Sequence, residues 1–136
     1  MYKGSCLCGA IELTLEGGIT DIIHCHCSLC RKSSGTAYAT NGIVNVAELK
    51  VVDPDKQLTY FEVKKGMKRH FCKTCATPMF SSNAQNPSRY RIRLGVLDSD
   101  ITERPSAHNF VTSKANWDDL DVDLPRNDRY EAARSR

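Results

Sequence analysis

Alternating apolar and polar residues mark the first extended segments of the chain. Residues Ala10–Leu15 alternate with a period of two and end at Gly17 and Gly18. This pattern predicts a β-strand that enters a turn, because successive side chains of a strand point to opposite faces of a sheet. Ile19–Ile23 follows as the expected return strand. We therefore expect a strand pair that delivers the chain to a group of cysteines beginning at Cys25.

Further short strands are predicted along the rest of the chain. Tyr90–Val96 alternates tyrosine, arginine, isoleucine, arginine and leucine, which indicates a strand with a polar edge. Pro54, between two aspartates, marks a turn. Ser28–Ser34 is polar and compact and predicts a single helical turn. The other strand candidates are residues 38–40, 49–52, 58–61, 68–71 and 79–82, the last two flanking a cysteine pair as a hairpin would.

The overall pattern predicts one mainly β domain. No segment has the 3.6-residue apolar repeat of a long helix, and 136 residues correspond to about one domain. The acidic stretch Asp118–Asp123 is expected to be a solvated loop. We assign residues 1–125 to this domain and residues 126–136 to a polar C-terminal tail.

Charge and hydropathy exclude several classes of partner. Nineteen basic and 16 acidic residues leave a formal net charge of +3, which is too small to indicate a nucleic-acid partner. No apolar run approaches the roughly 20 residues that span a bilayer, and the first residues lack the apolar core of a secretory signal. We therefore expect a cytoplasmic protein that binds neither nucleic acid nor a membrane.

Seven cysteines dominate the candidate chemistry. Disulfides are not expected in a reducing cytoplasm, and scattered buried thiols would not gather in tight groups. Thiolates at short spacings are typical ligands of zinc. The groups are Cys6/Cys8, Cys25/Cys27/Cys30 and Cys72/Cys75. We predict two zinc ions per chain, one held by four cysteines and one by three.

The first predicted zinc site combines Cys6 and Cys8 with Cys72 and Cys75. The second pair has the C-x-x-C spacing at which two thiolates reach one tetrahedral ion from a tight turn, and the first pair offers two more sulfurs. Four thiolates leave no open position, so we expect a structural ion whose binding stabilises the fold. A redox role for the C-x-x-C pair is the alternative, but no thioredoxin-like βαβ pattern surrounds it.

The second predicted site packs Cys25, Cys27 and Cys30 into six residues. Three protein ligands and one open position are typical of a catalytic zinc. Three thiolates make the ion electron-rich, which favours holding a thiol substrate as its thiolate over activating water for hydrolysis. The alternative is a second structural site completed by a histidine. The candidate histidines are His24, His26 and, at longer range, His70.

Several polar residues near the second site are candidates for contacts with a substrate. Arg31 and Lys32 offer cations to a bound carboxylate, and Ser34 offers a hydroxyl to sulfur. For each of the three, a solvated surface position or loop filling is the alternative. Trp117 is a candidate for stacking on a ligand, although a place in the core is the commoner role of a tryptophan.

The cysteine motifs have a specific order and context. They stand as Gly4–Ile11, Cys25–Gly35 and Phe71–Pro78, followed by a later stretch, Ser113–Trp117. In this order they resemble the glutathione-dependent formaldehyde-activating (GFA) enzymes, a family that also includes centromere protein V-like domains. The resemblance covers roughly residues 4–124. Ala76 stands where the family commonly has Gly, and Ala at a positive φ costs about 1 kcal/mol.

The resemblance implies a fold, two metal sites and a reaction. The implied fold is a β-tent of several small antiparallel sheets stapled by the four-cysteine zinc, similar to methionine sulfoxide reductase B. The implied reaction is that of a carbon–sulfur lyase, which joins glutathione and formaldehyde, or another small aldehyde, into S-hydroxymethylglutathione-type adducts. The implied ligands are Cys6, Cys8, Cys72 and Cys75 for the structural ion and Cys25, Cys27 and Cys30 for the catalytic one.

Two other functions are open on the sequence alone. The chain can bind glutathione or a thiol adduct without catalysing its formation, or it can serve as an interaction domain, as some relatives in the family do. Its near-neutral charge favours the enzyme over a chromosome-associated domain.

Overall fold

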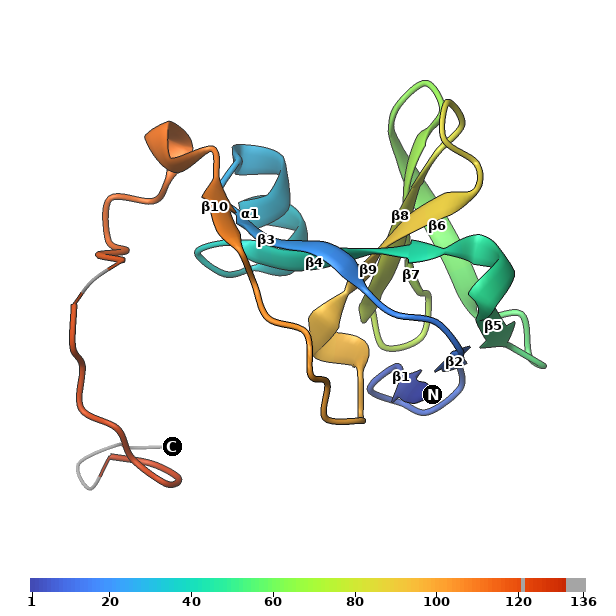
Figure 1. Ribbon diagram of the computed structural model, residues 1–136, viewed down its shortest axis with the longest axis horizontal. Coiled ribbons are helices and arrows are strands. Elements are labelled where there is room, and N and C mark those ends of the chain that lie inside the picture. Colours follow the sequence, from blue (N-terminus) through green and yellow to red (C-terminus); the bar gives the residue numbers. More distant parts are fainter. Residues whose placement is uncertain (121, 132–136) are drawn as a thin grey trace.

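The computed structural model describes residues 1–120 and 122–131 and is mainly β (Figure 1), as predicted. Its strands form a three-stranded sheet in the order β1-β2-β5 and a seven-stranded sheet in the order β10-β3-β4-β9-β8-β7-β6. The strands are β1 (Tyr2–Ser5), β2 (Glu12–Leu15), β3 (Thr20–Cys25), β4 (Ala39–Asn45), β5 (Leu49–Val52), β6 (Leu58–Lys64), β7 (Met67–Cys72), β8 (Pro78–Asn83), β9 (Arg89–Arg93) and β10 (Ala107–Asn109). The helical segments are α1 (Ser28–Ser34) and the 3-10 helices η1 (Val46–Glu48), η2 (Leu94–Val96) and η3 (Val111–Ser113).

The small sheet is built around the first alternating segment of the sequence. In β2, Leu13 and Leu15 are buried while Glu12 is exposed, as a period of two requires. Its neighbours are β1 and β5, and both pairings are antiparallel. The predicted pairing of this strand with Ile19–Ile23 is therefore wrong. Because β1 and β5 occupy both edges of β2, the residues after Gly18 enter the large sheet as β3 and pair with β4.

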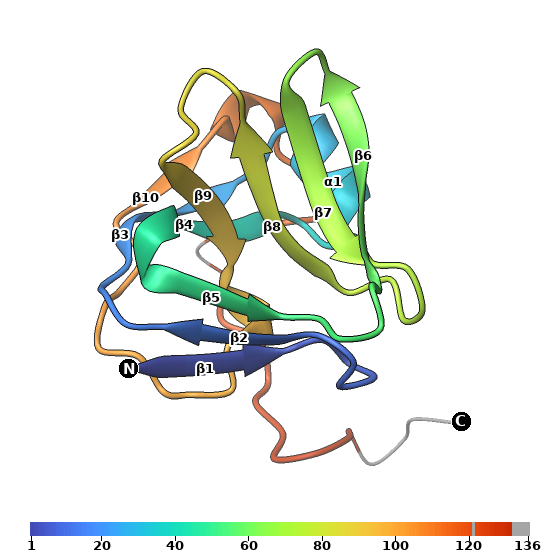
Figure 2. The same ribbon diagram turned by 90° about the vertical axis from the view of Figure 1, so that its right-hand side faces the viewer.

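The main core lies between the two sheets. Leu13 and Leu15 of the small sheet belong to one buried cluster with Val44, Met79 and Ile92 of the large sheet. Figure 2 shows β1, β2 and β5 lying beneath the strands of the large sheet. Burying one such side chain contributes about 1.5–3 kcal/mol, so this cluster fixes how the two sheets pack and where their loops meet.

The large sheet is antiparallel except at one edge. There β10 runs parallel to β3, with Asn109 paired to Cys25 and His108 paired to His24. The backbone N–H of His26 also donates to the carbonyl of Asn109, at 2.9 Å. A short C-terminal strand that the sequence did not predict therefore lies against the middle cysteine group.

Strand β9 differs from its predicted description. It ends at Arg93, where η2 begins, and it lies between β4 and β8 in the interior of the sheet. The side chain of Arg93 is only 7% exposed, so this arginine does not face solvent, whereas Arg91 is exposed as the predicted polar edge requires. Alternation places Arg91 and Arg93 on one face of the sheet.

The chain after β10 leaves the two sheets, and Figure 1 shows it running away from them toward the C-terminus. The predicted solvated loop holds for Asp119, which is exposed, but not for Asp118, whose side chain is 20% exposed and faces His26. Asp121 lies outside the described residues, as does the 132–136 part of the predicted tail. The domain boundary at residue 125 stays a prediction. In the described part of the chain, no helix is both long and apolar enough to cross a membrane.

Candidate functional site

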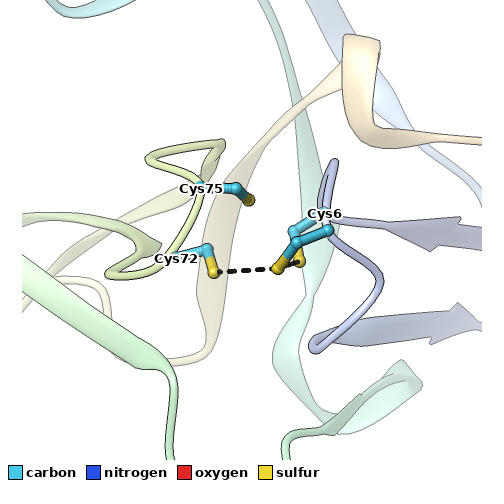
Figure 3. A group of neighbouring side chains, drawn as sticks. Cys6, Cys72 and Cys75 are labelled. Carbon is cyan, nitrogen blue, oxygen red and sulfur yellow. Dashed lines mark hydrogen bonds between the residues drawn. The ribbon is translucent and has the colours of Figure 1, made fainter.

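Four thiols from two distant segments converge beside the small sheet, and Figure 3 shows Cys6, Cys72 and Cys75 pointing toward one another. The Sγ atoms of Cys6 and Cys8 are 3.6 Å apart, and those of Cys8 and Cys72 are 3.8 Å apart. All four lie within 4.8 Å of one another. A tetrahedral zinc with Zn–S bonds of about 2.3 Å separates its sulfurs by about 3.8 Å, whereas a disulfide needs about 2.05 Å. The donor set therefore fits a four-thiolate metal site and no disulfide.

Each cysteine pair lies on a tight turn. Gly9 follows Cys8 with φ 80°, and Ala76 follows Cys75 with φ 62°. Only glycine adopts such values without a steric cost. The expected positive φ at Ala76 is therefore confirmed. Gly9 has the same position relative to its cysteine pair and adopts a positive φ without a steric cost.

Local hydrogen bonds stabilise negative charge on these sulfurs. The backbone N–H of Ile11 donates to the Sγ of Cys6 at 3.3 Å. The hydroxyl of Thr77, 3.1 Å from the Sγ of Cys75, lowers the pKa of that thiol to about 5. Hydrogen bonds to the charged form favour it, so this environment suits thiolate ligands.

Three further thiols converge where β3 meets α1. Cys25 ends β3, Cys27 is the N-cap of α1, and Cys30 lies in the first turn of the helix. The Sγ of Cys27 accepts a hydrogen bond from the N–H of Cys30 at 3.4 Å, which is a normal capping contact. The three Sγ atoms lie within 4.8 Å of one another. The predicted single helical turn is thus a seven-residue helix whose beginning presents two of the three sulfurs.

Burial and mutual repulsion govern ionisation in this group. Burial, together with the neighbouring thiols of Cys30 and Cys27, raises the pKa of Cys25 to about 12. Burial also acts to raise the pKa of Cys27, but the N–H of Cys30 and the adjacent thiols outweigh it, so the net shift is downward. Three sulfurs this close need a cation to be thiolates together. The donor set fits a zinc ion with three protein ligands.

The candidate histidine ligands are engaged elsewhere. Among the described residues, the group that could hold an ion here consists of the three cysteines and includes no histidine. The ring of His26 is fully buried, and its Nδ1 lies 3.8 Å from an Asp118 oxygen. The ring contacts are His24 Nδ1 with Thr40 Oγ1 at 2.8 Å, His26 Nε2 with His108 Nδ1 at 2.9 Å, and His70 Nε2 with Ser82 Oγ at 2.9 Å. The geometry therefore favours three protein donors over four.

A pocket of about 300 Å³ opens beside Cys25 and Cys30, both of which line it. Apolar side chains, among them Leu29, Met67 and Phe110, form part of its wall. Within the described part of the chain, no carboxylate lines the pocket. A cleft lined by charges of one sign attracts ligands of the opposite sign, so this pocket favours anions. Its cationic lining residues are Lys64, Lys68, Arg69, Arg91 and Arg93.

The predicted substrate contacts on α1 lie apart from this pocket. Arg31, Lys32 and Ser34 are not among the residues that line it. Ser34 donates to the carbonyl of Cys30 at 2.7 Å and lines a neighbouring cavity of about 340 Å³. The contacts of these three residues with a substrate stay predictions. Trp117 is 67% exposed, so its expected place in the core is wrong.

Sequence reasoning missed the polar residues that surround the pocket. Arg91 and Arg93 carried a usable signal, because a strand places alternate residues on one face. Asn41 carried none, because it reaches the pocket through the pairing of β4 with β9, whose residues are far away in the sequence. Arg69 lies in the predicted hairpin, but the sequence did not indicate that this hairpin borders the pocket. Asp118 reaches His26 from a loop without regular structure.

Comparisons with known proteins agree with the arrangement of the cysteines. The family model described as glutathione-dependent formaldehyde-activating enzyme matches residues 1–113, which include all seven cysteines. A Halomonas elongata protein, provisionally named glutathione-dependent formaldehyde-activating enzyme, is 26% identical over 129 residues, which cover 89% of this chain and 82% of that protein. The crystal structure of a Rhodobacter sphaeroides protein matches with a TM-score of 0.61 and 27% identity, covering 78% of this chain and 98% of that one. The chain therefore belongs to the glutathione-dependent formaldehyde-activating (GFA) enzyme family.

Proposed function

We propose that this protein is a zinc-dependent carbon–sulfur lyase that joins glutathione, or a similar thiol, to formaldehyde or another small aldehyde. The observation that carries this proposal is the convergence of Cys25, Cys27 and Cys30 beside a cationic pocket. Family membership supports the reaction class. Because the site needs free thiolates, we propose the reducing cytoplasm as its location.

The proposed reaction forms one carbon–sulfur bond and one O–H bond, breaks the S–H bond and the carbonyl π bond, and changes no oxidation state overall. The sulfur of the thiol bonds to the carbonyl carbon of the aldehyde, and the proton of the thiol ends on the carbonyl oxygen. With glutathione and formaldehyde, the product is S-hydroxymethylglutathione. The reaction therefore needs neither an oxidant nor a redox cofactor.

The chain's own residues have distinct proposed roles. We assign Cys25, Cys27 and Cys30 to the catalytic ion, and Cys6, Cys8, Cys72 and Cys75 to a structural ion. A zinc ion bound to three thiolates would keep one coordination position open. It would lower the pKa of a thiol substrate that binds there. Arg31, Lys32 and Ser34 remain proposed contacts for the substrate at the far end of α1.

Metal analysis combined with exchange kinetics tests the proposal. The protein is purified anaerobically without chelator, its zinc content is measured, and glutathione–formaldehyde exchange is followed by NMR exchange spectroscopy. Uncatalysed addition is subtracted, since thiols add to formaldehyde unaided. We expect two zinc ions per chain and an exchange rate above background for the wild type. Cys27→Ser should lower both values, whereas Ser28→Ala, an exposed neighbour that leaves the three thiols intact, should lower neither.

Two results would contradict the proposal. A folded wild-type protein with one zinc per chain would remove the catalytic ion. Tight glutathione binding with exchange no faster than background would favour a carrier that binds the thiol without catalysis.

A further inference from the structure

The strand register places a row of polar side chains across the pocket face of the large sheet. Arg69 of β7 pairs with Ser81 of β8, and Ser81 pairs with Arg91 of β9. Arg93 lies two residues beyond Arg91 and therefore on the same face. Directly opposite Arg93, in β4, is Asn41. All five residues line the pocket beside Cys25 and Cys30.

Arg93 is a buried cation at this site. Its side chain is 7% exposed, and among the described residues it forms no ion pair with a carboxylate. Among the described residues, its side chain makes one hydrogen bond, a long one of 3.5 Å from Nη1 to the carbonyl of Arg91. Burial and, to a smaller extent, the neighbouring cation of Arg69 lower the pKa of Arg93 to about 10, while Cys30 acts in the opposite direction. Arg93 is thus still charged at neutral pH and has unused donors.

Asn41 presents a complementary unused group. Its side chain is 5% exposed, and its Oδ1 is buried without a hydrogen-bond partner among the described residues. A buried carbonyl without a hydrogen-bond partner is energetically unfavourable, so a ligand N–H that donates to it would bind more tightly. The pocket therefore offers guanidinium donors for an anion and, next to them, an acceptor for an amide hydrogen.

We propose that Asn41, Arg91 and Arg93 are specificity-determining residues that select a thiol bearing both a carboxylate and an amide N–H. The guanidinium groups of Arg91 and Arg93 bind the carboxylate, and the Oδ1 of Asn41 accepts the amide hydrogen. Arginine suits this role because its planar fork matches carboxylate geometry. The inference rests on the proposed function, since it concerns the thiol that enters the same site.

Three small thiols separate the two recognition elements. Glutathione carries both a carboxylate and amide N–H groups, 3-mercaptopropionate carries only the carboxylate, and N-acetylcysteamine carries only the amide. Formaldehyde exchange is measured with each thiol, and binding of each thiol to the zinc-loaded protein is measured by calorimetry. We expect the wild type to prefer glutathione over both of the other thiols.

Variants of Arg91, Asn41 and Arg93 test which residue recognises the carboxylate and which recognises the amide. Arg91→Gln, at an exposed position, should raise KM and Kd for glutathione and 3-mercaptopropionate about tenfold, the loss of a charge-assisted hydrogen bond, with kcat little changed. It should not affect N-acetylcysteamine. Asn41→Ala should weaken the two amide thiols and spare 3-mercaptopropionate. Arg93→Lys keeps the charge but loses the fork, so it should weaken the carboxylate thiols. Arg89→Gln removes the same charge from the same strand outside this pocket and should change nothing.

The inference is overturned if Arg91→Gln and Arg93→Lys leave glutathione binding unchanged, or if they weaken N-acetylcysteamine equally. Failure of the proposed function gives a different result, namely exchange at the background rate with all three thiols, while calorimetry still reports which thiol the pocket binds.

Discussion

The backbone of Ala76 adopts a positive φ that is sterically unfavourable for a residue with a Cβ. Its φ of 62° is shared by the equivalent turn at Gly9, where no Cβ is present. The cost of the conformation, about 1–2 kcal/mol, is paid in the folded state and exceeds the entropy that glycine adds to the unfolded chain.

We therefore expect Ala76→Gly to stabilise the zinc-loaded protein by about 0.5–1 kcal/mol. The free energy of unfolding in urea measures this change. Ala47→Gly is the matched control, because Ala47 is also exposed but lacks a positive φ, and it should destabilise. A loss of stability in Ala76→Gly would contradict the assignment of strain to this turn.

The turn between β5 and β6 depends on Asp53. Its two carboxylate oxygens accept hydrogen bonds from the N–H groups of Leu58 and Gln57, each at 2.8 Å. These bonds lower the pKa of Asp53 below its ordinary value. A carboxyl whose pKa is lower in the folded state stabilises the fold above the unfolded-state pKa, and that contribution is lost as the pH falls through the folded-state pKa.

Asp53→Asn should therefore be less stable than the wild type at pH 7, because an amide offers one acceptor oxygen. The difference should shrink as the pH falls below about 4, where the carboxyl of the unfolded chain becomes protonated, and disappear below the lowered pKa of the folded-state carboxyl. Urea unfolding of both proteins at each pH measures it, so that any loss of metal in acid affects both alike. Asp55→Asn, an exposed change of equal charge in the same turn, should show no such pH dependence.

Local pattern was sufficient to predict most strands and the cysteine groups. The alternation of Ala10–Leu15 predicted a half-buried strand, and the cysteine spacing predicted two groups whose sulfurs now prove to converge. Pairing was harder to predict, because the sheet that β3 joins depends on β1 and β5, which occupy both sides of β2, rather than on the residues of β3 itself. The pocket could not be predicted from the sequence for the same reason, because its polar residues come together only through the register of the paired strands.

At the scale of the whole molecule, sulfur atoms that are far apart in the sequence lie close together in the four-cysteine group. Cys8 and Cys72 are separated by 64 positions, yet their Sγ atoms are 3.8 Å apart. A metal at this point links the N-terminal turn to the turn between β7 and β8. The three-cysteine group, in contrast, lies within one local segment.

We expect Cys72→Ser to impair mainly stability and Cys27→Ser to impair mainly activity. Cys72→Ser should lower the free energy of unfolding by on the order of several kcal/mol, because metal binding there contributes to folding. Cys27→Ser should reduce exchange activity with a much smaller change in melting temperature. Thermal unfolding with zinc analysis of both variants checks this, and a Cys72→Ser protein as stable as the wild type would refute the structural role.

The unequal sequence span of the two cysteine groups has a consequence for biosynthesis. The donors at Cys25, Cys27 and Cys30 are all present once residue 30 has left the ribosome, whereas the other set is incomplete until residue 75 has emerged. Closing the longer loop also carries a larger entropic cost. If both groups bind zinc as proposed, the three-cysteine group can therefore bind its ion earlier in translation than the four-cysteine group.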